Sequence, residues 1–374
     1  MNILVVNWRC IKNPEAGGAE VHLHEIFSRI AAAGHDVTLV SHYFSGAARK
    51  EVVDGIKIIR IGNKFIFDRQ FKKYYLKNFA DKNFDLVVDD ISKIPLNTPQ
   101  YVKQPLVAII HHLHGKTLYE ELFYPAAHYI YKKESQIPAV YASTPIFAVS
   151  PSTKNELIEK GYPAEKIGLL YNAIAQQYFT DDYPKKNEHP SLIYIGRLKR
   201  YKKLETIIDA MPAIIKEFPD ITLKIGGMGS HAEQLSNYIN TKGLIENVYM
   251  MGKVTEEEKV ALLRESWIFI TMAAKEGWGI TVIEANAGYT TVIGSDVPGL
   301  RDSIKNGETG ILSPYNDPQK LAENVINLLR NKEKLKQYQL NAKDWANKFS
   351  WENSVLEFKN QLAEFYPELK PKLF

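Results

Sequence analysis

The stretch that decides the fold reads Trp267-Ile268-Phe269-Ile270-Thr271 and continues, after a short loop, as Glu276-Gly277-Trp278-Gly279-Ile280-Thr281-Val282-Ile283-Glu284. The first run is apolar and rich in isoleucine, which predicts a buried strand. The second opens with a Gly-rich loop and continues as a helix. A strand, a loop and a helix in this order form part of a parallel βαβ unit. Ligands of such sheets bind beyond the carboxyl ends of the strands, so the loop is a candidate site.

Similar units recur along the whole chain, between stretches with a helical pattern such as 19–33, which ends before Gly34, and 256–265. In the first half we predict strands at 3–7, 36–41, 55–61, 84–89, 106–110 and 145–150, which form one parallel sheet. In the second half we predict strands at 192–195, 221–225, 248–251, 267–271, 291–294 and 310–312. A polar, proline-containing stretch at 181–190 separates the two series. The sequence therefore predicts an α/β protein with two doubly wound parallel sheets.

Composition agrees with two folded domains and excludes several other classes. The chain has 374 residues, 45% apolar and 24% charged, values typical of globular proteins. The net charge of +4 is too small for the whole protein to be a nucleic-acid binder. Cys10 is the only cysteine, so no intramolecular disulfide can form. The apolar run at 3–6 is too short for a signal peptide, and no run reaches the ~18 residues that span a membrane. We expect a cytoplasmic protein.

The Gly-rich loop can bind an anion or a sugar. Gly277 and Gly279 permit a close approach of the backbone, and the amides of 278–280 can donate to a phosphate or a sugar hydroxyl. Glu276 and Glu284 suit hydroxyl groups on either side. The alternative is an ordinary turn with a surface glutamate and a capping carboxylate.

Two further loops carry phosphate-binding chemistry. Gly196-Arg197-Leu198-Lys199-Arg200-Tyr201-Lys202-Lys203 follows the first strand of the second half, and Arg197 and Lys202 can converge on a diphosphate. We assign the remaining cations to a solvated basic loop. Gly17-Gly18-Ala19-Glu20 opens the helix at 19–33, where backbone amides can reach a phosphate, although such pairs are often only tight turns.

Together the three segments resemble the E-x7-E, G-R-L-x-x-x-K and G-G-x-E motifs of family 4 retaining glycosyltransferases. The resemblance implies the GT-B fold, in which two Rossmann-like domains face each other across an interdomain cleft. It implies an N-terminal acceptor-binding domain at 1–175 and a C-terminal nucleotide-sugar-binding domain at 176–352. Residues 353–374 would form a helix that crosses back to the N-terminal domain.

The resemblance also implies roles for single residues. Arg197 and Lys202 would bind the diphosphate, Glu284 the ribose, and Glu276 and His111 the transferred sugar. The catalytic set is thus Glu276, His111, Arg197 and Lys202, and the donor-binding set is Gly17, Gly18, Gly196, Gly227, Lys253, Val254, Gly277, Trp278, Gly279, Ile280 and Glu284. Trp278 replaces the commoner Phe and Lys203 stands where Gly is usual, which leaves the identity of the sugar open.

The implied reaction transfers a hexose-type sugar with retention, from a UDP-sugar or GDP-mannose to a saccharide or a lipid-linked saccharide. The products would be cell-envelope glycans or polysaccharides. We expect no cofactor and no metal, because neither 89–90 nor 181–182 forms a D-x-D clamp. His111, His112 and His114 suggest zinc, but no further spaced ligand completes a site.

Two other functions are compatible with parts of the sequence. Residues 227–232 fit the dinucleotide pattern G-x-G-x-x-A, which would make the second domain an NAD-binding one. The acidic residue expected after the strand at 248–251 is absent, and Lys253 and Val254 follow Gly252 instead. The other alternative is a nucleotide-sugar epimerase on the same fold.

Residues 63–79 interleave aromatic and basic side chains, with a net charge of +4. Phe67, Phe71, Tyr74 and Tyr75 with their flanking lysines can rest on an anionic membrane, which would place the protein at the inner face of the membrane. The alternative is a helix packed on its own domain with a solvated lysine face.

Overall fold

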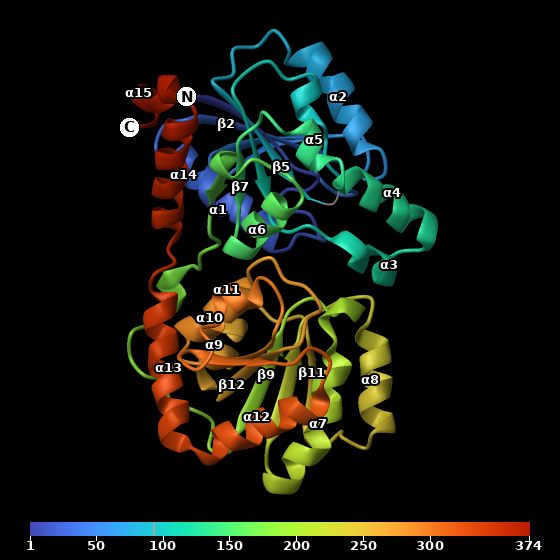
Figure 1. Ribbon diagram of the computed structural model, residues 1–374, viewed down its shortest axis with the longest axis vertical. Helices are drawn as coiled ribbons and strands as arrows, with labels where there is room; N and C mark the ends of the chain where they lie inside the picture. The colour runs from blue at the N-terminus through green and yellow to red at the C-terminus, as the bar shows by residue number, and fades with distance from the viewer. Residues whose placement is uncertain (93) are drawn as a thin grey trace. The chain divides into compact units, whose positions relative to one another are not determined.

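The structure is a computed structural model that describes residues 1–92 and 94–374, and it divides into two units. Unit 1 consists of Met1–Ala173 and Trp351–Phe374, and unit 2 consists of Ile174–Ser350. The predicted boundaries lay at 175/176 and 352/353. Each unit is built on one central sheet (Figure 1).

The sheet of unit 1 has eight strands in the order β3-β4-β2-β1-β5-β6-β7-β8. Neighbouring strands are parallel except β3 and β4, which are antiparallel. The strands are β1 (Asn2–Val6), β2 (Asp36–His42), β3 (Lys50–Val53), β4 (Ile56–Ile61), β5 (Leu86–Ile91), β6 (Leu106–Ile110), β7 (Ile146–Ala148) and β8 (Ile167–Leu169). The prediction of six parallel strands was therefore wrong for this unit, since it lacked β3 and β8.

The two missed strands have weak sequence signals. β3 and β4 form a hairpin whose turn residues Asp54 and Gly55 have φ of +46° and +81°, the left-handed conformation that tight hairpin turns require. β3 lies at the edge of the sheet, and its side chains are exposed or half-buried. Because Lys50 and Glu51 occupy half of β3, it shows no apolar run. β8 is only three residues long and contains Gly168.

The helices of unit 1 include connections between its strands and, at the C-terminus, α14 (Trp351–Phe365) and α15 (Lys370–Leu373), which follow the last strand of the chain. The others are α1 (Gly18–Ala32), α2 (Phe67–Asn78), α3 (Leu118–Glu121), α4 (Tyr124–Glu134), α5 (Ile137–Val140) and α6 (Pro151–Glu159). Single 3-10 turns lie at Thr98–Gln100, Gly115–Thr117, Ala164–Lys166 and Pro367–Leu369. α14 packs against α1, with the ring of Phe358 5.8 Å from that of Phe27 and 5.0 Å from that of Phe147 (Figure 1).

The aromatic residues of α2 belong to the core of unit 1. Phe67, Phe71 and Tyr75 are at most 1% exposed, and they pack against the sheet together with Leu4 and Val6. Their spacing of four residues places them on one face of the helix. Of the two interpretations of 63–79, rings resting on a membrane are therefore wrong for Phe67, Phe71 and Tyr75. The structure has the alternative arrangement, a packed helix whose basic residues Arg69, Lys72, Lys73 and Lys77 are exposed.

The sheet of unit 2 has six parallel strands in the order β11-β10-β9-β12-β13-β14. They are β9 (Ser191–Ile195), β10 (Thr222–Gly226), β11 (Val248–Gly252), β12 (Ile268–Thr271), β13 (Thr291–Ser295) and β14 (Gly310–Ser313). All six coincide with predicted strands to within a residue or two. The predicted fold class, two α/β domains built on parallel sheets, is confirmed.

The helices of unit 2 enclose its sheet (Figure 1). They are α7 (Leu204–Glu217), α8 (Ala232–Thr241), α9 (Glu256–Glu265), α10 (Ile280–Ala287), α11 (Leu300–Ser303), α12 (Pro318–Arg330) and α13 (Lys332–Ala346), with 3-10 turns at Gln176–Tyr178 and Arg200–Lys202. One apolar core joins the strands to α7 and α12 through Ile208, Ile270 and Val325. Within residues 1–92 and 94–374, no helix is both long enough and apolar enough to span a bilayer.

Candidate active site

Four neighbouring strands of unit 2 bring most of the predicted donor-binding residues to one edge of the sheet. Gly252 ends β11, Gly226 ends β10, Gly196 follows β9, and the loop that contains Glu276 follows β12. These strands are adjacent in the order β11-β10-β9-β12 and parallel, so their carboxyl ends lie side by side. From β9 the chain runs outward to β10 and β11 and then returns to β12. The site therefore includes the switch point at which ligands of doubly wound sheets bind.

At this switch point Lys202 and Glu276 form an ion pair. The Nζ atom of Lys202 lies 2.6 Å and 3.0 Å from the two carboxylate oxygens of Glu276. The side chains are 11% and 23% exposed, so the pair is screened only partly by water. Burial lowers the pKa of Lys202, but the Glu276 carboxylate outweighs this effect and raises the pKa above its ordinary value. Lys202 is therefore a permanent cation next to a carboxylate.

Lys203 follows Lys202 directly and has a backbone conformation that favours glycine. Lys203 has φ of +49° and ψ of +46°, the left-handed conformation that glycine adopts without strain. This backbone ends the 3-10 turn Arg200–Lys202 and starts α7 directly afterwards. A lysine here costs about 1 kcal/mol relative to glycine.

Arg197 is exposed beside this pair. Its NH2 group donates to the hydroxyl of Tyr201 at 3.3 Å, and the Nζ atom of Lys202 lies 5.1 Å from the centre of the Tyr201 ring. Tyr201 thus holds both cations on one side of the loop.

The Gly-rich loop after β10 packs directly on the loop after β9. A Cβ atom on Gly227 would lie 1.9 Å from the carbonyl oxygen of Gly196, and one on Gly229 would lie 2.0 Å from that of Leu198. The amide of Leu198 also donates to the carbonyl of Met228 at 2.9 Å. Glycine is therefore required at 227 and 229 by the close packing of the two loops, and dinucleotide binding is not needed to explain it.

The loop of Glu276 is positioned by close packing. A Cβ atom on Gly299 would lie 2.2 Å from the carbonyl oxygen of Glu276, and Gly279 precedes α10 with φ of +85°. The side chain of Trp278 is 3% exposed and its ring lies 5.0 Å from that of Phe349, so it anchors the loop in the core. α10 begins at Ile280, with its N-terminal end next to Glu276 in the chain.

Glu284 is held by a lysine from the neighbouring helix. The Nζ atom of Lys259 on α9 lies 2.6 Å from Oε1 of Glu284 and 2.8 Å from Oε2 of Glu256. Burial lowers the pKa of Lys259, and the two carboxylates raise it to a net value above the ordinary one. The Glu284 carboxylate is therefore neutralised and kept in one place.

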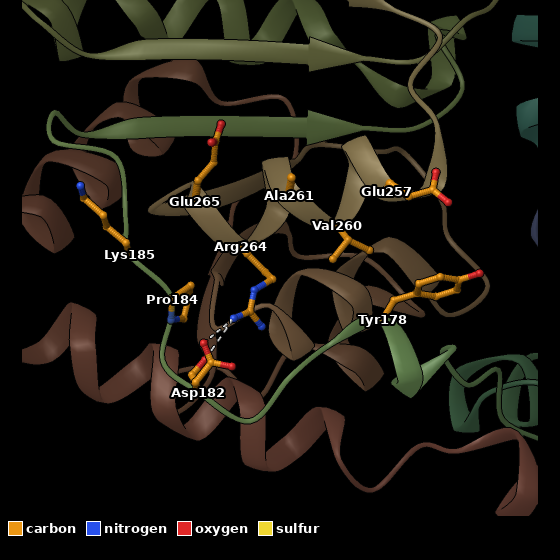
Figure 2. A pocket seen from close by; sticks show the side chains of 9 residues that line it. All are labelled: Tyr178, Asp182, Pro184, Lys185, Glu257, Val260, Ala261, Arg264 and Glu265. Carbon is orange, nitrogen blue, oxygen red and sulfur yellow. Dashed lines mark hydrogen bonds and ion pairs between the residues drawn. The ribbon is translucent and has the colours of Figure 1, made fainter.

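Two surface hollows lie along α9. The smaller, about 270 Å³, is lined by Lys253, Val254 and Glu258 among others, and Val254 packs against Gly226. The larger, about 520 Å³, is lined by none of the predicted residues. Its Arg264 forms an ion pair with Asp182, with an N–O distance of 3.2 Å, and Figure 2 shows the two side chains facing each other. Only the smaller hollow adjoins the predicted donor-binding residues.

In unit 1 the Gly17-Gly18 loop opens α1. The amide of Gly17 donates to Oε2 of Glu20 at 2.7 Å, and NH1 of Arg9 lies 3.8 Å from Oε1 of the same carboxylate. Gly17 has φ of −147°, an extended conformation that any residue can adopt. The fold of the loop thus gives no conformational reason for a glycine at this position.

His111 directly follows β6 and is buried. Its Nε2 atom lies 2.8 Å from Oδ1 of Asp90, near the end of β5. His112 and His114 have ring centres 4.3 Å apart, and the amide of His114 donates to the buried carboxylate of Glu134 at 2.6 Å. Within the described ranges 1–92 and 94–374, no three histidine, cysteine or acidic side chains gather in a way that could hold a metal ion.

Sequence reasoning missed Lys259 and gave no role to Asp90. Lys259 belongs to a helix whose pattern looks like an ordinary exposed one, so its contact with Glu284 depends on tertiary structure alone. Asp90 had a usable signal, because it is a carboxylate near the end of a strand that is buried throughout.

Two family models match the chain. The model described as glycosyltransferase family 4 matches residues 16–177, and the model described as glycosyl transferases group 1 matches residues 176–345. The chain therefore belongs to the glycosyltransferases of the family 4 type, which have the GT-B fold.

Individual proteins agree with this assignment. A glycogen synthase from Mycobacterium tuberculosis is 25% identical over 360 residues, 88% of this chain and 86% of that protein. The sucrose-phosphate synthase structure from Thermosynechococcus elongatus has a TM-score of 0.81 at 18% identity and covers 98% of this chain and 99% of that one. The Anabaena protein HepE, solved with UDP and glucose, has a TM-score of 0.76 at 16% identity, with coverages of 97% and 100%.

Proposed function

We propose that this glycosyltransferase moves a hexose-type sugar, with retention at the anomeric carbon, from a UDP-sugar or GDP-mannose to a saccharide or lipid-linked saccharide. The observation that carries the proposal is the ion pair of Lys202 and Glu276, with Arg197 beside it. A nucleotide sugar presents a phosphate next to sugar hydroxyls. The cation Lys202 can bind the phosphate, and the neighbouring carboxylate of Glu276 can bind the sugar hydroxyls.

The donor would be bound along the edge of unit 2. Arg197 and Lys202 bind the diphosphate. The ion pair of Lys202 and Glu276 opens, and Glu276 accepts a hydrogen bond from a sugar hydroxyl instead. Glu284, held by Lys259, accepts hydrogen bonds from the ribose. The hollow beside Lys253 and Val254 receives the base. HepE, a structural neighbour solved with UDP and glucose, supports a donor of this kind.

The reaction would proceed through departure of the diphosphate. The bond between the anomeric carbon and the phosphate oxygen breaks, and Arg197, Lys202 and the amides before α10 stabilise the developing negative charge. The acceptor oxygen bonds to the same face of the sugar and gives its proton to an oxygen of the leaving phosphate. These cations and amides take the role that a divalent metal has in other transferases.

Unit 1 would bind the acceptor and contribute His111 and the Gly17-Gly18 loop. Because the dihedral angles of Gly17 do not require glycine, we attribute the small residue to space for a phosphate. Peripheral contact with an anionic membrane would use the exposed basic face of 63–79 together with Phe65, which is 80% exposed. Such contact would place a cytoplasmic enzyme next to a lipid-linked acceptor at the inner face of the membrane.

Thermal-shift binding of UDP, GDP, ADP, TDP and NAD, with EDTA present, tests the donor class. We expect one nucleoside diphosphate to stabilise the wild type and not Glu284→Ala. Stabilisation by NAD alone would contradict the proposal. The matching nucleotide sugar is then incubated with candidate saccharides, and NMR of the product establishes whether the anomeric configuration is retained. An isomerised donor without a transferred product would indicate an epimerase.

A further inference from the structure

The buried pair of Asp90 and His111 defines which atom of His111 is available to a ligand. Asp90 pairs in register with Ile109 across β5 and β6, and His111 lies two residues beyond Ile109. Side chains two residues apart in extended chain point to the same face of a sheet. The strands thus bring the two side chains together, and Oδ1 of Asp90 lies 2.8 Å from Nε2 of His111.

Among the residues that the structure describes, His111 is the hydrogen-bond partner of the Asp90 side chain. It is 1% exposed, and Oδ2 is buried without a hydrogen-bond partner among residues 1–92 and 94–374. Within the same residues the one ion pair of Asp90 is with His111. A buried carboxylate without a full set of hydrogen bonds costs free energy. Its presence is therefore better explained by an effect on His111 than by stability.

Packing against an aromatic neighbour also fixes the orientation of the His111 ring. The ring of His22 on α1 lies 5.1 Å away at an interplanar angle of 89°, and the ring of Trp351 lies 5.9 Å from that of His22. Burial and the neighbouring His111 hold the pKa of His22 well below its ordinary value, so His22 is neutral. An edge-to-face neighbour restricts rotation of the His111 ring and adds no charge.

We propose that Asp90 is a positioning residue that keeps the Nε2 proton of His111 directed at its carboxylate, so that Nδ1 is the atom presented to the donor sugar. This inference rests on the proposed function, since only that function places a sugar at His111. In the neutral ring Nδ1 accepts a hydrogen bond from a sugar hydroxyl, and in the protonated ring it donates one.

The charges around His111 determine its protonation. Burial lowers its pKa, while Asp90 on β5, through charge and hydrogen bond, and Glu20 on α1 raise it to a net value above the ordinary one. His22 on α1 also faces the His111 ring. Removal of the Asp90 charge should therefore lower the pKa of His111.

Long-range ¹H–¹⁵N NMR of histidine-labelled protein without substrate tests the inference directly. His111→Gln identifies the His111 signals. We expect the Nε2–H tautomer in the wild type, and a lower pKa with mixed tautomers in Asp90→Asn. The matched control is Asp54→Asn, since Asp54 binds Nε2 of His24 at 2.8 Å; it should change His24 alone. An Nδ1–H tautomer in the wild type would overturn the inference, and this part of the test does not depend on any variant folding. Unchanged His111 signals in Asp90→Asn would also overturn it.

Kinetics provide a second test. We expect Asp90→Asn to lower kcat by roughly 10- to 100-fold, with KM for the donor within about threefold, because the carboxylate orients a group that contacts the donor. Asp90→Glu should restore part of kcat, and Asp54→Asn should leave it unchanged. An Asp90→Asn enzyme with wild-type kcat would overturn the inference. A wild type that transfers no sugar at all would count against the proposed function, whereas the NMR result would still decide the tautomer.

Discussion

Asp89 makes the stability of unit 1 depend on pH in a direction opposite to that of most carboxylates. Its side chain is fully buried in β5, where one oxygen accepts hydrogen bonds from the hydroxyls of Thr98 and Tyr141, both at 2.6 Å. Burial raises the pKa of Asp89 from 3.8 to about 6, and the neighbouring Asp90 adds to the rise. The folded state therefore binds this proton more tightly than the unfolded state, and it loses stability as the pH rises from about 4 to about 6.

The size of the effect follows from the two pKa values. At about 1.4 kcal/mol per pH unit, the difference between 3.8 and about 6 corresponds to a loss of about 3 kcal/mol. Most of it, about 2 kcal/mol, falls between pH 4 and pH 7. Asp89→Asn removes the ionisation but keeps an oxygen that can accept from Thr98 and Tyr141. Its amide NH₂ group is buried and costs about 1–3 kcal/mol at every pH.

The pH dependence of the difference is thus the quantity to measure, because the constant cost cancels. Equilibrium urea unfolding is followed by tryptophan fluorescence from pH 4 to pH 7, and the free energy of unfolding of unit 1 is compared between Asp89→Asn and the wild type. We expect the variant to gain about 2 kcal/mol relative to the wild type over this range. Asp81→Asn, which changes an exposed carboxylate of the same unit, should show no such gain. A flat difference for Asp89→Asn would refute the reasoning.

Three further predictions concern unit 2. Lys202→Gln should lower the initial rate of sugar transfer by about 100-fold or more, because the leaving diphosphate loses a buried cation. Gly229→Ala should lower the free energy of unfolding of unit 2 by about 2 kcal/mol or more and raise KM for the donor. The new Cβ would lie 2.0 Å from the carbonyl oxygen of Leu198, so the loops after β9 and β10 must move apart. Lys259→Met should weaken binding of the nucleoside diphosphate about 10-fold in calorimetry, because Glu284 is no longer held.

Each of these variants has a matched control. Lys199→Gln removes a cation of the same loop that donates to Ser230, and its rate should stay within about threefold of the wild type. Gly243→Ala, also in unit 2, introduces strain at φ of +66° but meets no atom within 4 Å. It should lower the free energy of unfolding of unit 2 by about 1 kcal/mol without a change in KM. Lys320→Met removes a surface ion pair and should leave nucleotide affinity unchanged. Equal effects in variant and control would contradict the assigned roles.

The fold of unit 2 could be predicted because its signals are local. Each strand is a short apolar run, and all but β14 have a glycine at the carboxyl end or in the following loop. The chain order of these loops is enough to place them at one edge of the sheet. The edge strand β3 of unit 1 could not be predicted in the same way, since a half-exposed strand has no apolar run. For α2 the local signal was present, because Phe67, Phe71 and Tyr75 recur at helical spacing. That spacing indicates a packed helix, whereas the alternation of aromatic and basic residues is equally compatible with a membrane surface.

The site could be predicted as a set of residues but not as a set of contacts. Motif spacing indicated Lys202, Glu276 and Glu284 because each lies in or next to a strand-to-helix loop. The partners of Glu284 and His111 are 25 and 21 residues away in the chain and come from other elements. No periodic pattern relates such pairs. They follow from how strands and helices pack, which the sequence expresses only through the complete fold.

The two-segment construction of unit 1 has a consequence for the order in which the chain can fold. Trp351 and Phe358, which are at most 2% exposed, complete the packing around His22 and Phe27, yet they are synthesised after the whole of unit 2. On the ribosome, unit 2 is continuous and can reach its native state while unit 1 still lacks α14. The support for the His111 ring is therefore among the last parts of the enzyme to assemble. Nascent chains that stop before α14 would carry a folded unit 2 and an incomplete unit 1.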